Sequence, residues 1–444
     1  TEMKKEVLLT AAMLFLSSGA WAQWTIQQCI DHAMKNNITL QKARLENKSA
    51  QEDVKGAKGA LLPTVSASTN HSLGYQPWKD AGMTTVTNGT VNTKIDKTYY
   101  NGSYGVNAQW TGWNGNRNYN TLKQNKLTAE QAELQAEVTA NNIIEQIAQL
   151  YVQILYLTEA VKVSEQSLET SKKTEERGQE MLEVGKMSRA DVAQLSAQRA
   201  SDEYNIVESR ANISKNKLQL KQLLELDQTT DFDIVVPPTT DDMVLGEIPS
   251  LSDVYNQALL QRPEIKNSNI AVESSELSIK NAKAGALPTV NLTGVVGTNT
   301  NSLSGNGFGT QLKTNFDASA GVSVSVPIFD GRQTKTNVNK ARIRREQALL
   351  DLQDQHKQLY QTIENYWLDA VTNQQKYLAA VLTEKSEQES YDLLSEQFRL
   401  GLKNIVELMA GKDRLLVAQQ SKLQSKYLTI LAQQMLKFYG GKTI

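Results

Sequence analysis

The stretch GALLPTV at residues 59–65 has a near copy further along the chain, AGALPTV at residues 284–290. Its proline, Pro63, lies 225 positions before the corresponding Pro288, in a chain of 444 residues. A repeat at half the chain length indicates a duplicated architecture. Because proline cannot continue a helix and biases the residue before it toward an extended backbone, we expect each proline at a junction between a helix and a strand.

The likeness between the two halves extends beyond this phrase. CIDHAMKNNITLQKA at 29–43 aligns with VYNQALLQRPEIKNS at 254–268, and LEVGKMSRADVAQL at 182–195 aligns with FRLGLKNIVELMAG at 398–411. We therefore predict two repeats of one architecture, joined by an equatorial linker and followed by a short tail. Their expected bounds are 23–225 for the first repeat, 226–250 for the linker, 251–437 for the second repeat and 438–444 for the tail.

Two proline-free stretches predict unusually long helices. No proline occurs from Asn118 to Gln179 or from Gln333 to Arg399, so each stretch can form a helix about 90–100 Å long. Apolar residues in the first stretch recur at steps of four and three, the period of a coiled coil: Ile143, Ile147, Leu150, Ile154, Leu157 and Val161. We expect each long helix to pair with a second one as a hairpin, with tips at about 180–188 and about 398–404.

Four segments have the two-residue period of β-strands, at about 64–74, 102–112, 289–298 and 315–328. In FDASAGVSVSVPI at 316–328, apolar side chains alternate with small polar ones. Alternation over about ten residues is typical of a strand in a transmembrane β-barrel. A soluble antiparallel sheet with one wet face would alternate in the same way, but the long coiled coils and an export signal favour the membrane. The first half also has about nine extra residues, which we assign to a polar loop at 76–90.

Residues 1–22 have the pattern of a secretory signal peptide, with a buried first helix as the alternative. Lys4 and Lys5 precede an apolar run that ends in Ala20-Trp21-Ala22, an A-x-A-like cleavage site. After this segment no apolar run is long enough for a transmembrane helix. The 47 basic and 48 acidic residues nearly cancel, which argues against nucleic acid as a partner. The single cysteine, Cys29, cannot form an intrachain disulfide.

Four strands per chain require several chains to make a closed barrel. Open sheet edges would leave backbone groups unpaired in lipid, so a spanning sheet has to close. Two chains would give eight strands, a barrel about filled by its own side chains, whereas three would give twelve strands and a wider interior. Because the inward faces are small and polar, which suits a water-filled lumen, we expect a homotrimer that contacts membrane lipid on its outer surface.

Together these features closely resemble the TolC family of outer-membrane efflux ducts. The resemblance covers essentially the whole chain after the signal peptide and rests on the LPTV junctions, on VPIFDGR at 326–332, and on the tip phrases EVGKMSRADV at 183–192 and RLGLKNIVEL at 399–408. It implies a mainly α fold with transmembrane β, in which a trimeric twelve-stranded β-barrel continues into a twelve-helix periplasmic α-barrel.

The resemblance also implies a location and a function. The protein would lie in the outer membrane of a Gram-negative bacterium and extend into the periplasm. It would act as the passive exit duct of a tripartite efflux or type I secretion system. Its partners would be a periplasmic adaptor (a membrane fusion protein) and an inner-membrane pump of the RND, ABC or MFS type.

Residues at the hairpin tips take their expected roles from the resemblance. The family's periplasmic gate and constriction correspond to Asp191, Phe398, Lys403 and Glu407. Adaptor contact is implied for the tip residues Val184, Gly185, Lys186, Leu400, Gly401 and Leu402.

Two positions depart from the family pattern at this gate. Phe398 stands where the best-known members have a tyrosine, and Ala410 stands where they have a second acid in the constriction. The hydrogen-bonded latch and the acidic ring would therefore be weaker here. As an alternative role, Glu407 would only pair with a neighbouring basic residue on the helix surface.

No catalytic, cofactor-binding or metal site is predicted, and we expect a protein that is not an enzyme. His32, His71 and His356 are scattered and have no metal-ligand spacing. The segment RIRRE at 342–346 suits a solvated helix face or contact with anionic lipid headgroups. A periplasmic coiled-coil adaptor or structural scaffold is the alternative function, and the four alternating strands favour the duct.

Overall fold

The computed structural model describes residues 23–78, 82–86, 89–93, 96–227, 229 and 231–442. The predicted signal peptide at 1–22 and the end of the predicted tail lie outside the described residues. The chain divides into two compact units. Unit 1 contains the described parts of Thr1–Leu45, Glu133–Asn267 and Leu352–Ile444, and unit 2 contains those of Glu46–Ala132 and Ser268–Asp351.

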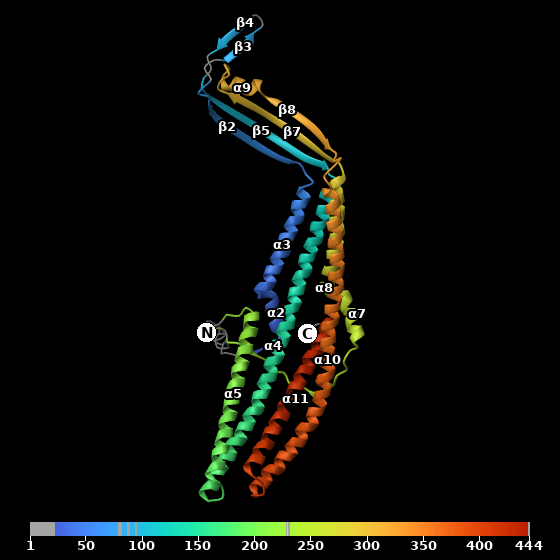
Figure 1. Cartoon of the computed structure of the whole chain (residues 1–444). Helices are drawn as coiled ribbons and strands as arrows, with labels where there is room; N and C mark the ends of the chain where they lie inside the picture. Colours follow the sequence, from blue (N-terminus) through green and yellow to red (C-terminus); the bar gives the residue numbers. More distant parts are fainter. Residues whose placement is uncertain are drawn as a thin grey trace, which may run out of the picture. The chain divides into compact units, whose positions relative to one another are not determined.

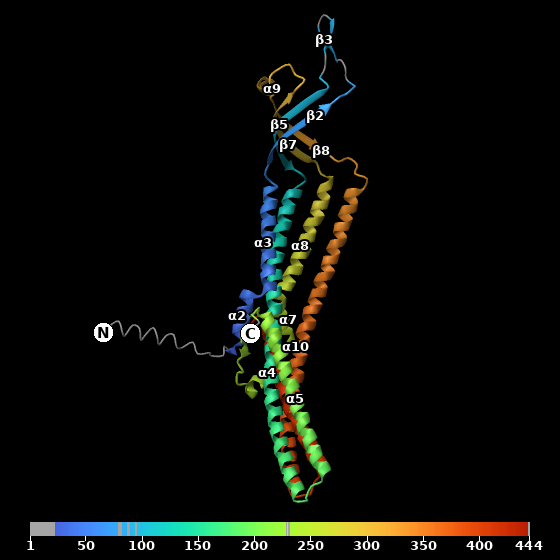
Figure 2. The same cartoon turned by 90° about the vertical axis from the view of Figure 1, so that its left-hand side faces the viewer.

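Unit 2 contains an antiparallel sheet of four strands, shown in Figures 1 and 2. The strands are β2 (Thr64–Tyr75), β5 (Thr98–Trp113), β7 (Thr289–Asn301) and β8 (Asp317–Ser325), in the order β2-β5-β7-β8. Each repeat therefore contributes one pair of strands, and the pairing of β5 with β7 joins the two repeats. The short helix α9 (Phe308–Thr314) lies between β7 and β8 in the chain.

Two local predictions in this region need correction. The expected strand at 315–328 is shorter, because β8 ends at Ser325 and the following Pro327 has no N–H for a strand ladder. The polar loop expected at 76–90 contains regular structure instead. β3 (Gly82–Val86) pairs antiparallel with β4 (Gly89–Thr93), so part of the extra length of the first repeat forms a two-stranded ribbon.

The junctions between helices and strands repeat in the two halves. Pro63 and Pro288 each stand one residue before a strand, β2 and β7 respectively. At the return to helix, two successive residues have positive φ in each repeat: Gly115 (68°) and Asn116 (64°), and Gly331 (60°) and Arg332 (72°). The left-handed region favours glycine at such turns. The two exits from the sheet therefore share one turn, although the sequences before them differ.

The long helices have the same lengths in both repeats. α4 (Arg117–Glu183) and α10 (Gln333–Arg399) each contain 67 residues, and α5 (Arg189–Leu223) and α11 (Ile405–Tyr439) each contain 35. In unit 1, α5 runs back along α4 and α11 runs back along α10 (Figure 1). Ion pairs cross each hairpin, for example Arg199–Glu175 at 2.6 Å in the first and Lys422–Glu384 at 2.7 Å in the second.

The remaining elements are short. They are β1 (Gln23–Trp24), α2 (Ile26–Asn36), α3 (Ile38–Gly59), β6 (Asp233–Ile234), α6 (Asp241–Leu245), α7 (Leu251–Gln261), α8 (Pro263–Lys283) and the 3-10 turn Ala284–Ala286. Within the expected linker at 226–250, β6 pairs parallel with β1. Within the described part of the chain, the helices lack the combination of length and apolar character that crossing a bilayer requires.

The core of unit 1 is divided into two main clusters; the first is built mostly from the first repeat, with Tyr427 of α11 added, and the second lies within α7, α8, α10 and α11. The first gathers Cys29 and Ile30 of α2 with Ile147 and Ile154 of α4. Ile143, Ile147, Ile154 and Val161 are all buried, as the coiled-coil period predicts. The second cluster gathers side chains of α7, α8, α10 and α11, with Ile363 and Leu436 fully buried.

Candidate functional site

The hairpin tips end their first helices in the same way. Gly185 (φ 73°) and Gly401 (φ 74°) are left-handed residues, each two positions after the last residue of α4 or α10. In the first tip the N–H of Lys186 donates to the carbonyl of Met181 at 2.7 Å, and in the second the N–H of Leu402 donates to that of Gln397 at 2.9 Å. This is the Schellman arrangement, in which a glycine closes a helix at little steric cost.

The second helix of each hairpin begins with a side-chain cap. Ser188 precedes α5, and its hydroxyl accepts from the N–H of Asp191 at 3.1 Å and donates to the Asp191 carboxylate at 2.8 Å. Asn404 precedes α11 and accepts from the N–H of Glu407 at 2.9 Å. Asp191 and Glu407 therefore occupy equivalent positions, where a carboxylate favours the helix N-terminus. Each of the two acids contributes to a helix start as well as carrying a charge at the tip.

Lys403 and Glu407 lie together at the second tip. The Lys403 ammonium donates to Glu407 Oε1 at 3.2 Å, and both side chains are about two-fifths exposed, at 40% and 43%. Asp191 instead bonds to Ser188 of its own hairpin. Within one chain the structure thus brings together Lys403 and Glu407, whereas Asp191 and Lys403 bond to different partners.

Phe398 belongs to an apolar cluster shared by both hairpins. It is 7% exposed and packs with Leu195 of α5 and with Ile405 and Leu408 of α11. Partly buried Met187, Tyr391 and Met409 surround this cluster. The phenylalanine, which has no hydroxyl for a latch, therefore holds the two tips of one chain together by packing.

A buried polar cluster above the tips was missed by the sequence reasoning. Lys412 of α11 donates to Asp202 of α5 and to Ser171 of α4, and the side chains of Lys412 and Asp202 are only 8% and 5% exposed. The Ser171 hydroxyl also donates to Asp202 at 2.5 Å. The signal in the sequence was a charge at a coiled-coil core position, since Lys412 lies four residues after Leu408 and three before Leu415.

Gln198 extends this polar cluster toward a second acid. Its side-chain amide donates to Asp202 at 3.1 Å and to Asp413 at 3.3 Å. Burial raises the pKa of the Asp413 carboxyl, and the nearby Asp202 charge raises it further, while Lys412 acts in the opposite direction.

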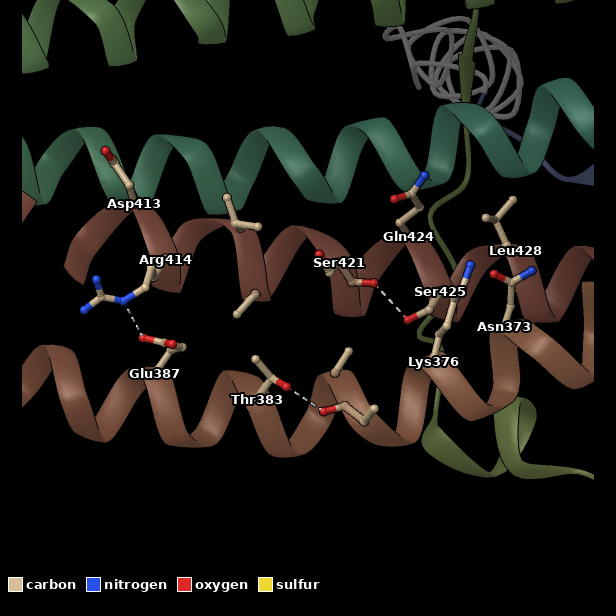
Figure 3. Close-up of a pocket in the computed structure, with 14 residues that line it drawn as sticks. Asn373, Lys376, Thr383, Glu387, Asp413, Arg414, Ser421, Gln424, Ser425 and Leu428 are labelled. Atoms are coloured by element: carbon tan, nitrogen blue, oxygen red, sulfur yellow. Dashed lines mark hydrogen bonds and ion pairs between the residues drawn. The ribbon is translucent and has the colours of Figure 1, made fainter. Parts of the chain in front are cut away.

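A groove of about 730 Å³ lies between α10 and α11 (Figure 3). Small side chains such as Ala379, Ala380 and Ser421 line it, and Arg414 and Glu387 form an ion pair across it at 3.3 Å. The side chain of Val417, which also lines the groove, is exposed. The groove therefore has a lining of small and partly apolar side chains, a surface that suits contact with another helix.

One face of the sheet in unit 2 is apolar across all four strands. Cross-strand partners share a face, and the pairs Val65–Ala108, Val106–Val296 and Leu292–Val322 all lie on this one. Several of these side chains are exposed: Val65, Val106, Leu292, Val296, Val322 and Val324. Exposed apolar surface of this extent marks an interaction or membrane site.

The opposite face of the same sheet is mostly small and polar. Ser66 pairs with Asn107, and Asn291 pairs with Ser323, so the hydroxyl and amide groups align across the strands. Val295 is an apolar exception on this face. The alternation expected from the sequence therefore continues in register from strand to strand.

Residues 29–225 and 254–442 match the family model of the outer membrane efflux proteins. The chain is 22% identical over 441 residues to the outer membrane efflux protein BepC of Brucella suis, covering 99% of this chain and 90% of BepC. It is 21% identical over 450 residues to the outer membrane protein TolC of Escherichia coli K12, covering 98% and 86%. It is also 21% identical to the alkaline protease secretion protein AprF of Pseudomonas aeruginosa, covering 92% and 82%.

Solved structures show the same fold. A crystal structure of CusC matches with a TM-score of 0.81 at 16% identity, covering 95% of this chain and 93% of that one. The CmeC outer membrane channel of Campylobacter jejuni matches with a TM-score of 0.76 at 20% identity, covering 94% and 86%.

These features define an outer-membrane protein of the channel-forming type, built from a duplicated helical hairpin and strand pair. The chain belongs to the outer membrane efflux protein family. This membership confirms the resemblance to the TolC family, the predicted fold class and the predicted location in the outer membrane with an extension into the periplasm. It also favours the duct over the alternative of a periplasmic adaptor or scaffold.

Proposed function

We propose that three copies of this chain form a passive exit duct across the outer membrane and periplasm, as part of a tripartite efflux or type I secretion system. The observation that carries this proposal is the two-faced sheet of unit 2, with an exposed apolar face and a small polar face in register. An apolar outer surface and a polar lumen are what a transmembrane β-barrel requires.

The height of the apolar face suits an outer membrane. On β5, Tyr104 and Trp113 lie on this face and nine residues apart, about 30 Å along a strand. A strand tilt of about 40° would reduce this distance to about 23 Å, close to the apolar band of about 25 Å in such barrels. Aromatic side chains at both ends of the band are typical of barrel strands at the two membrane interfaces.

The two edges of the sheet support assembly from several copies. β2 and β8 are its edge strands, and they run in opposite directions because all three pairings between them are antiparallel. The β8 strand of one copy can therefore pair antiparallel with β2 of the next, and closure removes both exposed edges. Three copies give twelve strands, enough for a water-filled lumen, whereas eight strands would be about filled by side chains.

The tips of the hairpins would form the periplasmic entrance. Phe398 and its apolar cluster hold the two tips of each chain together, and threefold symmetry would place three copies of Glu407 around one axis. The turns at Val184–Lys186 and Leu400–Leu402 are exposed and suited to contact with an adaptor. The names of the relatives CusC, a cation efflux system protein, and AprF, a secretion protein, support both efflux and secretion as the system's task. An adaptor and an inner-membrane pump are accordingly the proposed partners.

Native mass spectrometry of the detergent-purified chain, together with conductance in planar bilayers, tests this proposal. We expect a homotrimer that inserts and gives discrete single-channel steps. A monomer or dimer as the sole species would contradict the closure argument. A trimer that never conducts would contradict the role as a duct.

A further inference from the structure

A strongly basic zone lies at the base of the sheet in unit 2, where the helices end or begin. Here α3 and α8 end, and α4 and α10 begin (Figures 1 and 2). The four segments 53–60, 117–126, 276–283 and 330–340 contain ten Lys or Arg residues and three Asp or Glu residues. All ten basic residues are exposed, and the whole chain has a net charge of −1. Positive charge is therefore concentrated here, and we call these ten residues the basic collar.

Contacts within unit 2 place the four helix ends near one another. Asn118 of α4 donates to the carbonyl of Ala60, just after α3, at 3.4 Å. Gly285, just after α8, lies so close to Thr334 of α10 that an added Cβ would be 3.1 Å from its hydroxyl. The same Cβ would be 3.7 Å from a guanidinium nitrogen of Arg117. The collar is thus one zone contributed by both repeats.

Two tryptophans connect the collar to the apolar face. Trp110 pairs with Leu292 and Trp113 with Val290, so both indoles lie on the apolar face at its helical end. Tryptophan is enriched at the level where hydrocarbon gives way to headgroups, because its ring is apolar and its N–H is polar. These two residues therefore mark the inner boundary of the membrane.

The indole N–H groups donate hydrogen bonds to acceptors that lie close in the chain to basic residues of the collar. Trp110 donates to the carbonyl of Leu61 at 2.9 Å, one turn after Lys58, and Trp113 donates to the side chain of Asn116 at 3.2 Å, next to Arg117. Among the described residues, neither Lys58 nor Arg117 has an acidic ion-pair partner. Their charges are free to meet an anion at the headgroup level.

An amphipathic groove of about 540 Å³ lies in the same zone. Ile328 and Phe329, which follow β8, line it and are almost fully exposed, at 97% and 88%. Arg332 and Lys335 of the collar line it as well, together with Asp330, whose carboxylate accepts from the N–H of Thr334 at 2.7 Å. Apolar and cationic side chains in one groove match the chemistry of a phospholipid, with its acyl chains beside its phosphate.

We propose that the basic collar binds anionic phospholipid of the inner leaflet, holding headgroup phosphates at the base of the sheet. This inference rests on the proposed function, because it requires the apolar face to lie in the membrane. Long basic side chains can extend to the headgroups, and a basic residue near an anionic membrane surface contributes about 1 kcal/mol. The collar would set the depth of the duct in the bilayer through its attraction to anionic headgroups, in addition to the preference of the two tryptophans for the interface.

The test uses the purified full chain and measures which phospholipids it retains from mixed micelles of phosphatidylglycerol and phosphatidylethanolamine. We expect a preference for phosphatidylglycerol that high salt abolishes. In Lys58→Gln/Arg117→Gln, the preference at low salt should fall by roughly twenty- to thirty-fold, the equivalent of two headgroup contacts. The matched control is Lys172→Gln/Lys173→Gln, which removes two exposed positive charges from the part of α4 that belongs to unit 1, outside the collar. This variant should keep the preference for phosphatidylglycerol.

The possible outcomes separate this inference from the proposed function. Retention of both lipids without a preference would overturn the proposal that the basic collar binds anionic phospholipid, and it would leave the proposed function as a duct unaffected. Failure of the wild-type chain to retain any lipid or to insert into bilayers would overturn both. Competition by inorganic phosphate as strong as that of phosphatidylglycerol would identify a free-anion site instead. If the double variant does not assemble, the proposal is tested with Lys335→Gln, which should lower the preference for phosphatidylglycerol, and with the salt dependence of the wild-type chain. A preference that does not change with salt would contradict the proposal.

Discussion

Lys412 of α11 and Asp202 of α5 form an ion pair buried between the two hairpins of one chain, with Ser171 of α4 bonded to both. The pair lies next to the apolar tip cluster, since Leu408 precedes Lys412 by one turn of α11. A charge removed from water at this depth is tolerated only because its partner and hydrogen bonds compensate. The two hairpins are thus joined by packing at the tip and by charge above it.

Breaking this buried pair should be far more costly than breaking an exposed one. We expect Asp202→Ala to lower the free energy of unfolding by about 3–5 kcal/mol, because it removes the carboxylate that forms an ion pair with the buried Lys412 ammonium. Asp202→Leu/Lys412→Met, which removes both charges, should recover most of this loss. Thermal unfolding followed by circular dichroism in detergent measures both. The control is Glu165→Ala, which breaks the exposed pair with Arg210 and should change stability by about 0–1 kcal/mol.

The faces of β8 make a second prediction, because adjacent residues point to opposite sides of the sheet. Val322 pairs with Leu292 on the apolar face, and Ser323 pairs with Asn291 on the polar face. Val322→Arg should impair assembly, at a cost of about 2–4 kcal/mol if the side chain lies near the bilayer midplane. Ser323→Arg should leave assembly intact and change the conductance. Trimer yield and single-channel recordings of the two variants provide the comparison, and equal behaviour would show that the faces are misassigned.

Cys29 should be chemically silent in the folded protein. It is fully buried in the core of unit 1, and burial raises the pKa of its thiol from 9.0 to about 12. Because the folded state holds the thiol proton more tightly than the unfolded state, this difference stabilises the fold fully below about pH 9. The stabilisation is lost as the pH rises from 9 toward 12, where the thiol of the unfolded chain has ionised. We expect no maleimide labelling of the native protein at pH 8 and rapid labelling after denaturation. An added exposed thiol, Lys172→Cys, is the positive control, and fast labelling of native Cys29 would place it outside the core.

Much of this architecture follows from the sequence because its signals are local. The helix-to-strand junctions at Pro63 and Pro288, the two long proline-free stretches and the alternation in VSVSV at 322–326 can each be recognised from neighbouring residues. The partner of Lys412 could not be predicted, since Asp202 lies 210 positions away and the pairing depends on how two hairpins pack. The ribbon of β3 and β4 was missed because the sequences GMTTV at 82–86 and GTVNT at 89–93 have no alternation of apolar and polar residues, the feature by which strands are predicted.

Within a single chain Glu407 is a helix-surface partner of Lys403, whereas threefold symmetry would make it one of three carboxylates in a ring at the entrance. Its carboxylate pairs with Lys403 at 3.2 Å on an exposed helix surface, and its own N–H is capped by Asn404. An exposed pair of this kind is weak, so it does not prevent three such carboxylates from acting on ions in a narrow entrance. If they do, Glu407→Gln should lower the preference for cations over anions in planar bilayers and reduce block by multivalent cations.

The control variant, Asp191→Asn, makes the same charge change at the equivalent position of the first hairpin, where the carboxylate bonds to Ser188. A larger loss of selectivity in the Glu407 variant would assign the constriction to the second hairpin, and equal small effects in both would leave Glu407 as a helix-surface partner of Lys403.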